Sequence, residues 1–177
     1  GNATILSGYD AALVHRVYHV VTGADDAVLD GFTVRDGYAN GAAPDYDSAG
    51  LDLLNGTSPI IRHTVFTNNE ATRDGAHVKT QSGASPQFID CVFKNGIAGE
   101  DGGAVVCNIA GEPRFERCVF EDNQAAITGG ALRTYHTAPE FVDCVFRGNQ
   151  APTGGALVNS QRRGGSCRPS SLTGISV

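Results

Sequence analysis

Hydrophobic and polar positions along this chain alternate over short stretches, and the stretches themselves repeat. Four nine-residue segments share a proline at their second position and end in a Val-Phe pair; they cover residues 58–66, 85–93, 112–120 and 138–146. Their prolines, Pro59, Pro86, Pro113 and Pro139, are separated by 27, 27 and 26 residues. Because side chains of a β-strand point alternately to opposite faces, this alternation predicts short, half-buried strands in every repeat.

A second strand is expected in each repeat, after a turn rich in asparagine and glycine. Small residues lead into it, at 75–76, 102–104, 129–131 and 154–156. A period of 26 to 27 residues with several short strands and no helical periodicity is typical of a β-solenoid, in which each unit buries its apolar side against its neighbours. A leucine-rich repeat has a similar length, but its Leu-x-x-Leu-x-Leu pattern is missing. The sequence therefore predicts an all-β fold, a right-handed parallel β-helix.

Looser coils precede the regular ones. Residues 28–39 match residues 89–98 if one residue is inserted, and an extended loop follows over residues 40–48. Further upstream, residues 4–8 and 17–21 are predicted to be strands of a still earlier coil.

These coils predict one domain over residues 1–160, a solenoid of about six coils. The stretch 161–177 abandons the repeat and is expected to form an irregular C-terminal tail or a cap. A solenoid cut at this point leaves an open strand edge, which favours edge-to-edge self-association. Methionine is absent, so we expect Gly1 to follow a processing or excision point.

Cysteine and phenylalanine two positions apart are predicted to stack inside the solenoid. The pairs are Cys91 with Phe93, Cys118 with Phe120, and Cys144 with Phe146. Equivalent residues of stacked coils lie about 4.8 Å apart, and apolar surroundings keep a thiol protonated and unreactive. We therefore expect these cysteines to be buried free thiols, neither nucleophiles nor metal ligands.

One turn position carries asparagine in most repeats. Asn69, Asn123 and Asn149 occupy it, and Gly96 replaces asparagine in one coil. Both residue types tolerate the left-handed backbone conformation that a sharp corner needs. We therefore expect left-handed corners at these four positions.

Two sets of outward positions carry charges that alternate in sign between several neighbouring coils. One set is His63, Asp90, Arg117 and Asp143, and the other is Thr67, Lys94, Glu121 and Arg147. Opposite charges on neighbouring strands attract each other, so these sets are predicted to stabilise the stack and not to form a binding site.

The composition narrows the classes of partner. The chain has 177 residues with 23 glycines, 18% charged residues and a net charge of −6. An acidic chain argues against nucleic acid as a partner, because nucleic-acid-binding proteins usually present a basic face. No apolar run approaches the roughly 20 residues of a membrane-spanning helix, so no membrane span is expected.

The repeat consensus Ser-Pro-x-Phe-x-x-Cys-x-Phe-x-x-Asn-x-Ala-x-x-x-Gly-Gly-Ala resembles the repeat of the polymorphic outer membrane protein type. Residues 4–8 and 28–34 are similar to the lead-in of such repeats, so the resemblance covers roughly residues 1–160. It implies the β-helix architecture of the pectate-lyase-like superfamily, which includes adhesins, lyases, hydrolases and esterases. Thr64 in place of cysteine and Gly96 in place of asparagine remove no catalytic residue, because the repeat contains none.

These observations predict a secreted or cell-surface module with a structural or binding role, for which a polysaccharide or a cell-surface glycan is the candidate partner. The alternative is a carbohydrate-active enzyme, a polysaccharide lyase, glycoside hydrolase or esterase, that uses an exposed face of the β-helix. Its candidate catalytic residues, on strands after the small-residue turns, are Asp52, His77 and Arg133. Aligned on the turn, Asp52 and Arg133 share a file with Val78, and His77 is one residue out of step.

One loop gathers oxygen ligands within a short span. It contains Asp36, Asn40, Asp45, Asp47 and Asp52, and calcium binds such clusters. Asp36, Asp45 and Asp47 are therefore candidate metal ligands, with calcium as the candidate ion. The spacing is not that of an EF-hand or of the nonapeptide calcium repeat, so a solvated acidic loop without an ion is the alternative.

Overall fold

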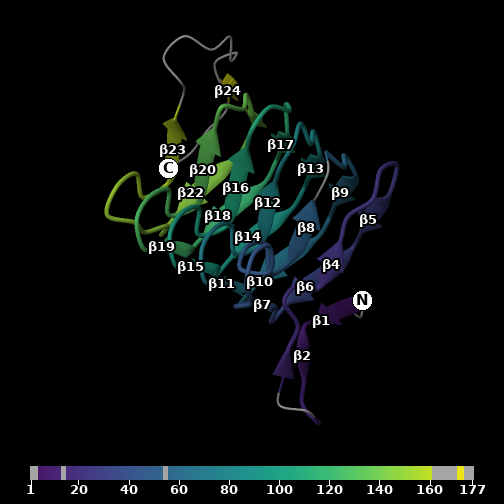
Figure 1. Cartoon of the computed structure of the whole chain (residues 1–177). Coiled ribbons are helices and arrows are strands. Elements are labelled where there is room, and N and C mark those ends of the chain that lie inside the picture. The colour runs from purple at the N-terminus through teal and green to yellow at the C-terminus, as the bar shows by residue number, and fades with distance from the viewer. Residues whose placement is uncertain (1–3, 13–14, 54–55, 161–170, 174–177) are drawn as a thin grey trace.

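The computed structural model describes residues 4–12, 15–53, 56–160 and 171–173, and Figure 1 shows strands of successive coils stacked side by side. Strands are the regular elements of this described part, which contains no helix. Strands of neighbouring coils pair in parallel, and one antiparallel hairpin stands apart from the stack. The predicted fold class, an all-β, right-handed parallel β-helix of about six coils, is therefore confirmed.

The chain passes through four parallel sheets, here named A to D in the order in which a coil visits them. Sheet A comprises β1 (Thr4–Ser7), β6 (Phe32–Arg35), β10 (Val65–Thr67), β14 (Val92–Lys94), β18 (Val119–Glu121) and β22 (Val145–Arg147). Sheet B comprises the short strands β7 (Tyr38–Ala39), β11 (Glu70–Ala71), β15 (Ile97–Ala98) and β19 (Gln124–Ala125).

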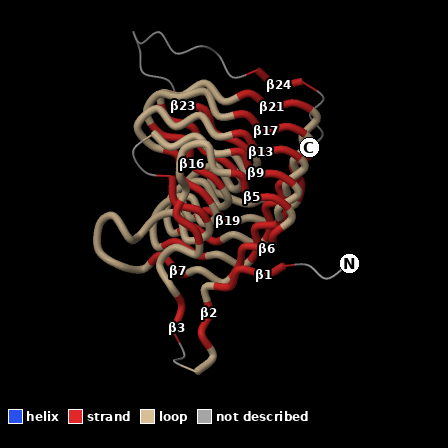
Figure 2. The backbone as a smooth tube through the Cα atoms, turned by 90° about the vertical axis from the view of Figure 1, so that its right-hand side faces the viewer, coloured by secondary structure: helices blue, strands red, loops and turns tan. Residues whose placement is uncertain are grey.

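The other two sheets complete each coil. Sheet C comprises β4 (Val21–Thr22), β8 (Leu51–Leu53), β12 (Val78–Thr80), β16 (Val105–Asn108), β20 (Leu132–Tyr135) and β23 (Leu157–Ser160). Sheet D comprises β5 (Val28–Asp30), β9 (Ile60–Arg62), β13 (Gln87–Ile89), β17 (Arg114–Glu116), β21 (Glu140–Val142) and β24 (Ser171–Thr173). Figure 2 shows these strands as layers of a stack.

The core is built from columns of aromatic rings. Phe93 stacks on Phe120 with ring centroids 4.8 Å apart, and Phe120 stacks on Phe146 at 4.6 Å. A second column contains Phe88 and Phe115, at 5.0 Å. These distances are close to the spacing of neighbouring strands, about 4.8 Å, because equivalent residues of successive coils occupy the same place in the coil.

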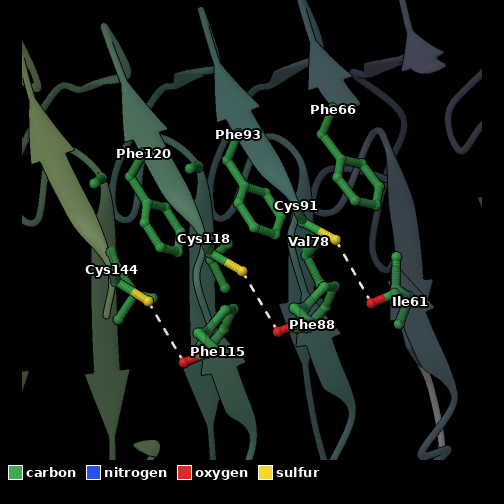
Figure 3. Packing of buried hydrophobic residues seen from close by; sticks show 14 of the residues in the cluster. Ile61, Phe66, Val78, Phe88, Cys91, Phe93, Phe115, Cys118, Phe120 and Cys144 are labelled. Carbon is green, nitrogen blue, oxygen red and sulfur yellow. Dashed lines mark hydrogen bonds between the residues drawn. The ribbon is translucent and has the colours of Figure 1, made fainter. Parts of the chain in front are cut away.

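The predicted cysteine positions are confirmed. Cys91, Cys118 and Cys144 are buried free thiols beside the phenylalanine columns. Figure 3 shows their sulfur atoms directed at carbonyl groups of the preceding coil, with Cys118 Sγ donating to the Phe88 carbonyl oxygen at 3.4 Å. Cys107 is also free and fully buried, and burial raises the pKa of its thiol to about 12.

The asparagine position has a different role from the one predicted. The left-handed conformation occurs one residue earlier, at Asn68, Asn95, Asp122 and Gly148, with φ between 53° and 64°. Asn123 is instead fully buried; its Nδ2 donates to the Phe93 carbonyl oxygen at 3.0 Å and its Oδ1 accepts from the Gly96 amide at 2.9 Å. The prediction was wrong because the inward amide satisfies backbone groups of the preceding coil, a role that pattern alone does not distinguish from a turn.

His77 fills the place where this asparagine column is interrupted. Its Nδ1 accepts from Asn69 Nδ2 at 3.0 Å, and its Nε2 donates to Asn123 Oδ1 at 3.2 Å. The intervening coil has Gly96 at the asparagine position, and a Cβ added there would come within 2.7 Å of His77 Nε2. The imidazole therefore replaces a missing amide, and burial lowers the pKa of His77 to about 4.

Several members of the predicted outward charge sets form ion pairs between coils. In the first set, Asp90 lies 2.7 Å from Arg117 and 3.8 Å from His63. His63 lies closer, at 2.8 Å, to Asp30, which is outside the set. In the second set, Arg147 pairs with Glu121 at 2.8 Å. Hydrogen bonds from Arg117 hold the pKa of the Asp90 carboxyl below its usual range. The members of the first set are corner residues and not strand residues, since His63, Asp90, Arg117 and Asp143 all have positive φ.

The N-terminal region departs from the predicted strands. Residues 17–20 form no strand; the chain instead makes an antiparallel hairpin of β2 (Tyr9–Asp10) and β3 (His15–Arg16) and joins sheet C only at β4. The hairpin projects from the N-terminal end of the stack (Figures 1 and 2). The predicted loop over residues 40–48 is confirmed as an irregular connection between β7 and β8.

The far end of the stack includes part of the predicted tail. Residues 171–173 form β24, which pairs in parallel with β21, and the remaining tail residues lie outside the described part of the chain. Sheet A ends on β1 and β22, and sheet D ends on β5 and β24. Self-association through these edges stays a prediction.

Candidate functional site

The predicted catalytic face lies on the outer side of sheet C. Strand pairing places Asp52 beside Lys79, Lys79 beside Val106, and Val106 beside Arg133. The file therefore contains Lys79, where the turn alignment predicted Val78. The alignment was wrong because the Gly-Gly-Ala entry of other coils is Gly-Ala-His in this one, so that His77 takes the alanine position.

Most of this file is closed to solvent: Asp52 is 5% exposed, Lys79 is 2% exposed and Val106 is fully buried. His77, which is outside the file, lies wholly inside the solenoid. His77 was predicted on an exposed face, and that placement is wrong because its imidazole completes the asparagine column. The structure does not bring His77 together with Asp52 and Arg133 at one surface. The catalytic role of the three residues stays a prediction.

A buried ion cluster surrounds Lys79. Its Nζ lies 2.6 Å from Asp47 Oδ2 and 2.9 Å from Asp74 Oδ2. Arg73, which stacks on the Tyr46 ring, is 3.3 Å from Asp47 and 3.4 Å from Asp74. Two cations thus balance two carboxylates beneath the connecting turns, which is the arrangement that makes buried charges tolerable.

The predicted calcium ligands are distributed over separate ion pairs. Asp47 binds the Lys79 ammonium, Asp45 lies 3.3 Å from His19, and Asp36 lies 3.1 Å from Arg35. Within the described part of the chain, no group of three His, Cys, Asp or Glu side chains is arranged to hold a metal ion. Burial raises the pKa of the neighbouring Asp52 carboxyl, partly offset by the charge of His19. Calcium binding by this loop stays a prediction.

A second cluster lies farther along sheet C. The Arg133 guanidinium pairs with Asp101, donates to Thr128 Oγ1 at 2.7 Å, and stacks 3.9 Å from the centre of the Tyr135 ring. Tyr135 donates its hydroxyl proton to Asp101 at 3.3 Å, and burial raises its pKa. Arg133 is therefore engaged on several sides, as Lys79 is. Along the outer side of sheet C, ion pairs at Lys79 and at Arg133 thus lie on either side of Val106.

The hairpin β2–β3 forms a surface that the sequence did not predict. Arg16 fixes it to the stack: its Nε donates to the Asp36 carbonyl oxygen at 2.9 Å, and its Nη2 donates to the Gly37 carbonyl oxygen at 2.6 Å. Its Nη1 lies 3.0 Å from Glu70, and the guanidinium stacks 4.9 Å from the centre of the Tyr38 ring. The repeat offered no signal here, because residues 9–16 have no counterpart in other coils.

Two grooves flank the hairpin. The first, of about 530 Å³, is lined by Tyr9, Arg16, Asp36, Asn68, Asn69, Glu70, Asn95 and Ile97. The second, of about 630 Å³, is lined by His15, Arg16, Val17, Tyr18, Tyr38 and Asn40. Tyr9 is 48% exposed and Tyr18 is 45% exposed. The first groove thus presents a half-exposed aromatic ring beside three asparagines, and the second presents one beside Tyr38 and Asn40.

A third groove lies on the same side of the solenoid, toward its C-terminal coils. It has about 380 Å³ and is lined by Gln124, Ala125, Ala126, Gln150, Ala151 and Pro152. Gln124 belongs to sheet B, and Gln150 pairs with it through an isolated parallel bridge. The first groove also reaches sheet B, through Glu70 and Ile97.

Comparison with known proteins agrees with this architecture. The family model described as right handed beta helix region matches residues 20–167. Searches of curated proteins and of solved structures found no match. The part of the chain that the structure describes holds no helix long and apolar enough to cross a membrane. Since the family match spans most of the sequence and the observed coils agree with it, the chain belongs to the right-handed β-helix family.

Proposed function

We propose that this chain is a secreted or cell-surface module that binds glycans at the two grooves beside the hairpin β2–β3. The observation that carries the proposal is the exposure of Tyr9 and Tyr18, one in each groove, next to hydrogen-bonding side chains. Tyrosine combines an apolar ring with a polar tip, which suits a ligand that has both apolar and hydroxylated surfaces.

The chemistry of the grooves matches that of sugars. A sugar ring has C–H faces that pack on an aromatic ring and hydroxyl groups that exchange hydrogen bonds with amides. Asn68 and Asn95 in the first groove and Asn40 in the second supply such amides. Binding sites commonly combine apolar surface with a few polar groups that fix orientation.

The repeat supports the proposed location. Its consensus resembles that of polymorphic outer membrane protein repeats, which occur in large bacterial surface and secreted proteins. The chain's regular coils provide a rigid support, while the hairpin at one end provides the irregular surface on which recognition commonly lies. Localisation at the cell surface or outside the cell, and glycans as partners, are parts of this proposal.

The carbohydrate-active enzyme is the alternative, and the test distinguishes it from the module. Glycan-array screening should identify oligosaccharides that bind the purified chain, and calorimetry should then measure their affinity for the wild type, Tyr9→Ala and Tyr18→Ala. We expect at least one tyrosine variant to lose about tenfold in affinity, or about 1.4 kcal/mol, which is more than most interface residues contribute. Ile109→Ala, which changes an exposed side chain outside the grooves, is the control.

Two results would overturn the proposal. One is the absence of binding to every glycan tested while circular dichroism shows a folded chain. The other is turnover of a polysaccharide or model ester by the wild type that Asp52→Ala or Arg133→Ala abolishes without unfolding, which would establish the enzyme.

A further inference from the structure

We infer that the ligand is a linear, uncharged glycan that lies along the outer face of sheet B, parallel to the solenoid axis. The inference rests on the proposed glycan binding and adds the course and the chemical class of the ligand. It begins from the hairpin grooves and extends them toward the C-terminal coils.

Sheet B places one side chain per coil on the surface. Its strands have two residues each, and the second residue is an inward alanine throughout: Ala39, Ala71, Ala98 and Ala125. The outward residues pair in register, Tyr38 with Glu70, Glu70 with Ile97, and Ile97 with Gln124. Contact positions therefore recur at the coil spacing of about 4.8 Å. A ligand built of regularly repeated units can use several of them at once.

The hollows of the surface follow the same line. The first groove includes Glu70 and Ile97, and the third includes Gln124 and Gln150. Ile97 and Gln124 are register partners, so the two grooves meet at neighbouring strands. Together these four outward residues mark a line of two neighbouring grooves, here called the trough, that runs from the hairpin toward the coil of Gln150. Within it, Ile97 is 50% exposed.

The charges of the trough select an uncharged ligand. Glu70 is the charged residue among its outward side chains, and it is paired with Arg16 at 3.0 Å. The guanidinium of Arg16 also donates to three backbone carbonyl groups, of Asp36, Gly37 and Asn68, so its donors are already engaged. A polyuronate would bring a carboxylate with every unit and would meet Glu70. Among the residues that line the first and third grooves, Arg16 is the cation, and it is already engaged. Hydroxyl groups, by contrast, match the amides of Asn68, Asn95 and Gln124.

The test combines ligand length with variants along the trough. Calorimetry with the full chain would use neutral manno-, cello- and chito-oligosaccharides, each from disaccharide to hexasaccharide, and oligogalacturonates of the same lengths. In at least one neutral series we expect affinity to rise with length, and the galacturonates to bind about tenfold more weakly or not at all.

Three variants locate the ligand. Ile97→Ala should weaken hexasaccharide binding by about tenfold, and Gln124→Ala should weaken the hexasaccharide while leaving the disaccharide unchanged. Ile109→Ala removes the same side chain as Ile97→Ala at similar exposure, 59%, but outside the trough, and should change neither. Circular dichroism and thermal melting should confirm that all three variants fold.

The outcomes separate this inference from the proposed function. Disaccharide binding that gains nothing with length, or hexasaccharide binding unaffected by Gln124→Ala, would overturn the trough and leave glycan binding at the hairpin in place. Tighter binding of galacturonates than of every neutral series would overturn the chemical class. Failure of every oligosaccharide to bind would overturn both.

Discussion

The outer sides of sheets C and B follow the same coil spacing but form opposite kinds of surface. On sheet C, Lys79 is almost completely buried within an ion cluster, and Arg133 is held by Asp101. On sheet B, the equivalent outward positions are uncharged at Ile97 and Gln124, and both are open to solvent. Strand alternation makes both sets of residues point outward, so alternation does not explain the difference.

The connecting turns explain it. The turns that lead from sheet B to sheet C bring Asp47, Asp74 and Asp101 over sheet C, one per coil, and there they meet Lys79 and Arg133. In a solenoid, an outward side chain is therefore a surface residue only where no turn covers it. Of these two sheets, sheet B is therefore the candidate for ligand binding.

Replacing Lys79 with methionine tests the covered outer side of sheet C. Of the predicted changes, it should lower the free energy of unfolding most. The change leaves Asp47 and Asp74 buried with Arg73 as the remaining cation in contact with both, and breaking a buried ion pair from one side costs about 3 to 5 kcal/mol. Denaturant unfolding should show this loss in the free energy of unfolding. Lys94→Met on sheet A, at a partly exposed position, is the matched control and should cost less than about 1 kcal/mol. Equal losses of unfolding free energy in the two variants would contradict the conclusion that Lys79 belongs to a buried ion cluster.

Lowering the pH tests the contribution of the buried His77 to the free energy of unfolding. The folded pKa of His77, about 4, lies below its unfolded value of 6.5, so its contribution is fully present above pH 6.5 and is lost as the pH falls toward 4. The loss of unfolding free energy from this group should be on the order of 3 kcal/mol over that window.

The matched variant for this prediction is His77→Ala. It introduces the residue that the following coils carry at the equivalent positions, Ala104 and Ala131. It removes the titrating group, so the slope of unfolding free energy against pH between 6.5 and 4 should become shallower than in the wild type. Identical slopes in the two proteins would show that His77 does not carry the dependence. His77→Ala combined with Gly96→Asn should destabilise less than the sum of the two changes, because the close contact of the new Cβ with His77 Nε2 is absent, while its contact with the Gly103 carbonyl oxygen remains.

Replacing Ile97 with glutamine tests the open face and should leave stability nearly unchanged. The side chain is half exposed on a two-residue strand, and surface substitutions of this kind usually change the free energy of unfolding by less than about 0.5 kcal/mol. Denaturant unfolding measures the change. A loss as large as that of Lys79→Met would mean that sheet B is covered in solution.

Calcium addition should change the stability of the protein least of all. Asp47 is already held by Lys79, and Asp36 and Asp45 lie in other ion pairs, so we expect no rise in the melting temperature in excess calcium. A ligand that prefers the folded state raises stability by mass action. A concentration-dependent rise that Asp47→Asn removes would establish the predicted calcium site.

Much of the fold could be predicted because most repeat positions carry a residue type that has one main structural role. The phenylalanines at Phe93, Phe120 and Phe146 and the cysteines before them recur at inward positions, and their burial follows from the apolar pattern. The charge pairs between coils could also be predicted, since neighbouring coils carry opposite signs at the same repeat position.

The candidate site was predicted less well, for two reasons. The entry into β12 replaces Gly-Gly-Ala with Gly-Ala-His, and an alignment on small residues therefore shifted that coil by one position. The hairpin of residues 9–16 has no counterpart in the repeat, so the grooves around Tyr9 and Tyr18 could not be found by comparing coils.

The sequence by itself determined the stack: its period, its strands, its inward phenylalanine and cysteine columns and its approximate number of coils. Each of these depends on contacts between equivalent positions of neighbouring coils, which a repeat specifies directly. Only the tertiary structure decided which outward residues are exposed and that His77 completes an asparagine column. These features depend on turns and side chains from different positions of the repeat meeting in space, as Lys79 meets Asp47 and His77 meets Asn123. The Lys79–Asp47 pair recurs as Arg133–Asp101, but each pair joins a turn residue to a strand residue of another coil, and the His77–Asn123 contact depends on a change in one coil. Comparison of equivalent repeat positions therefore does not reveal these contacts.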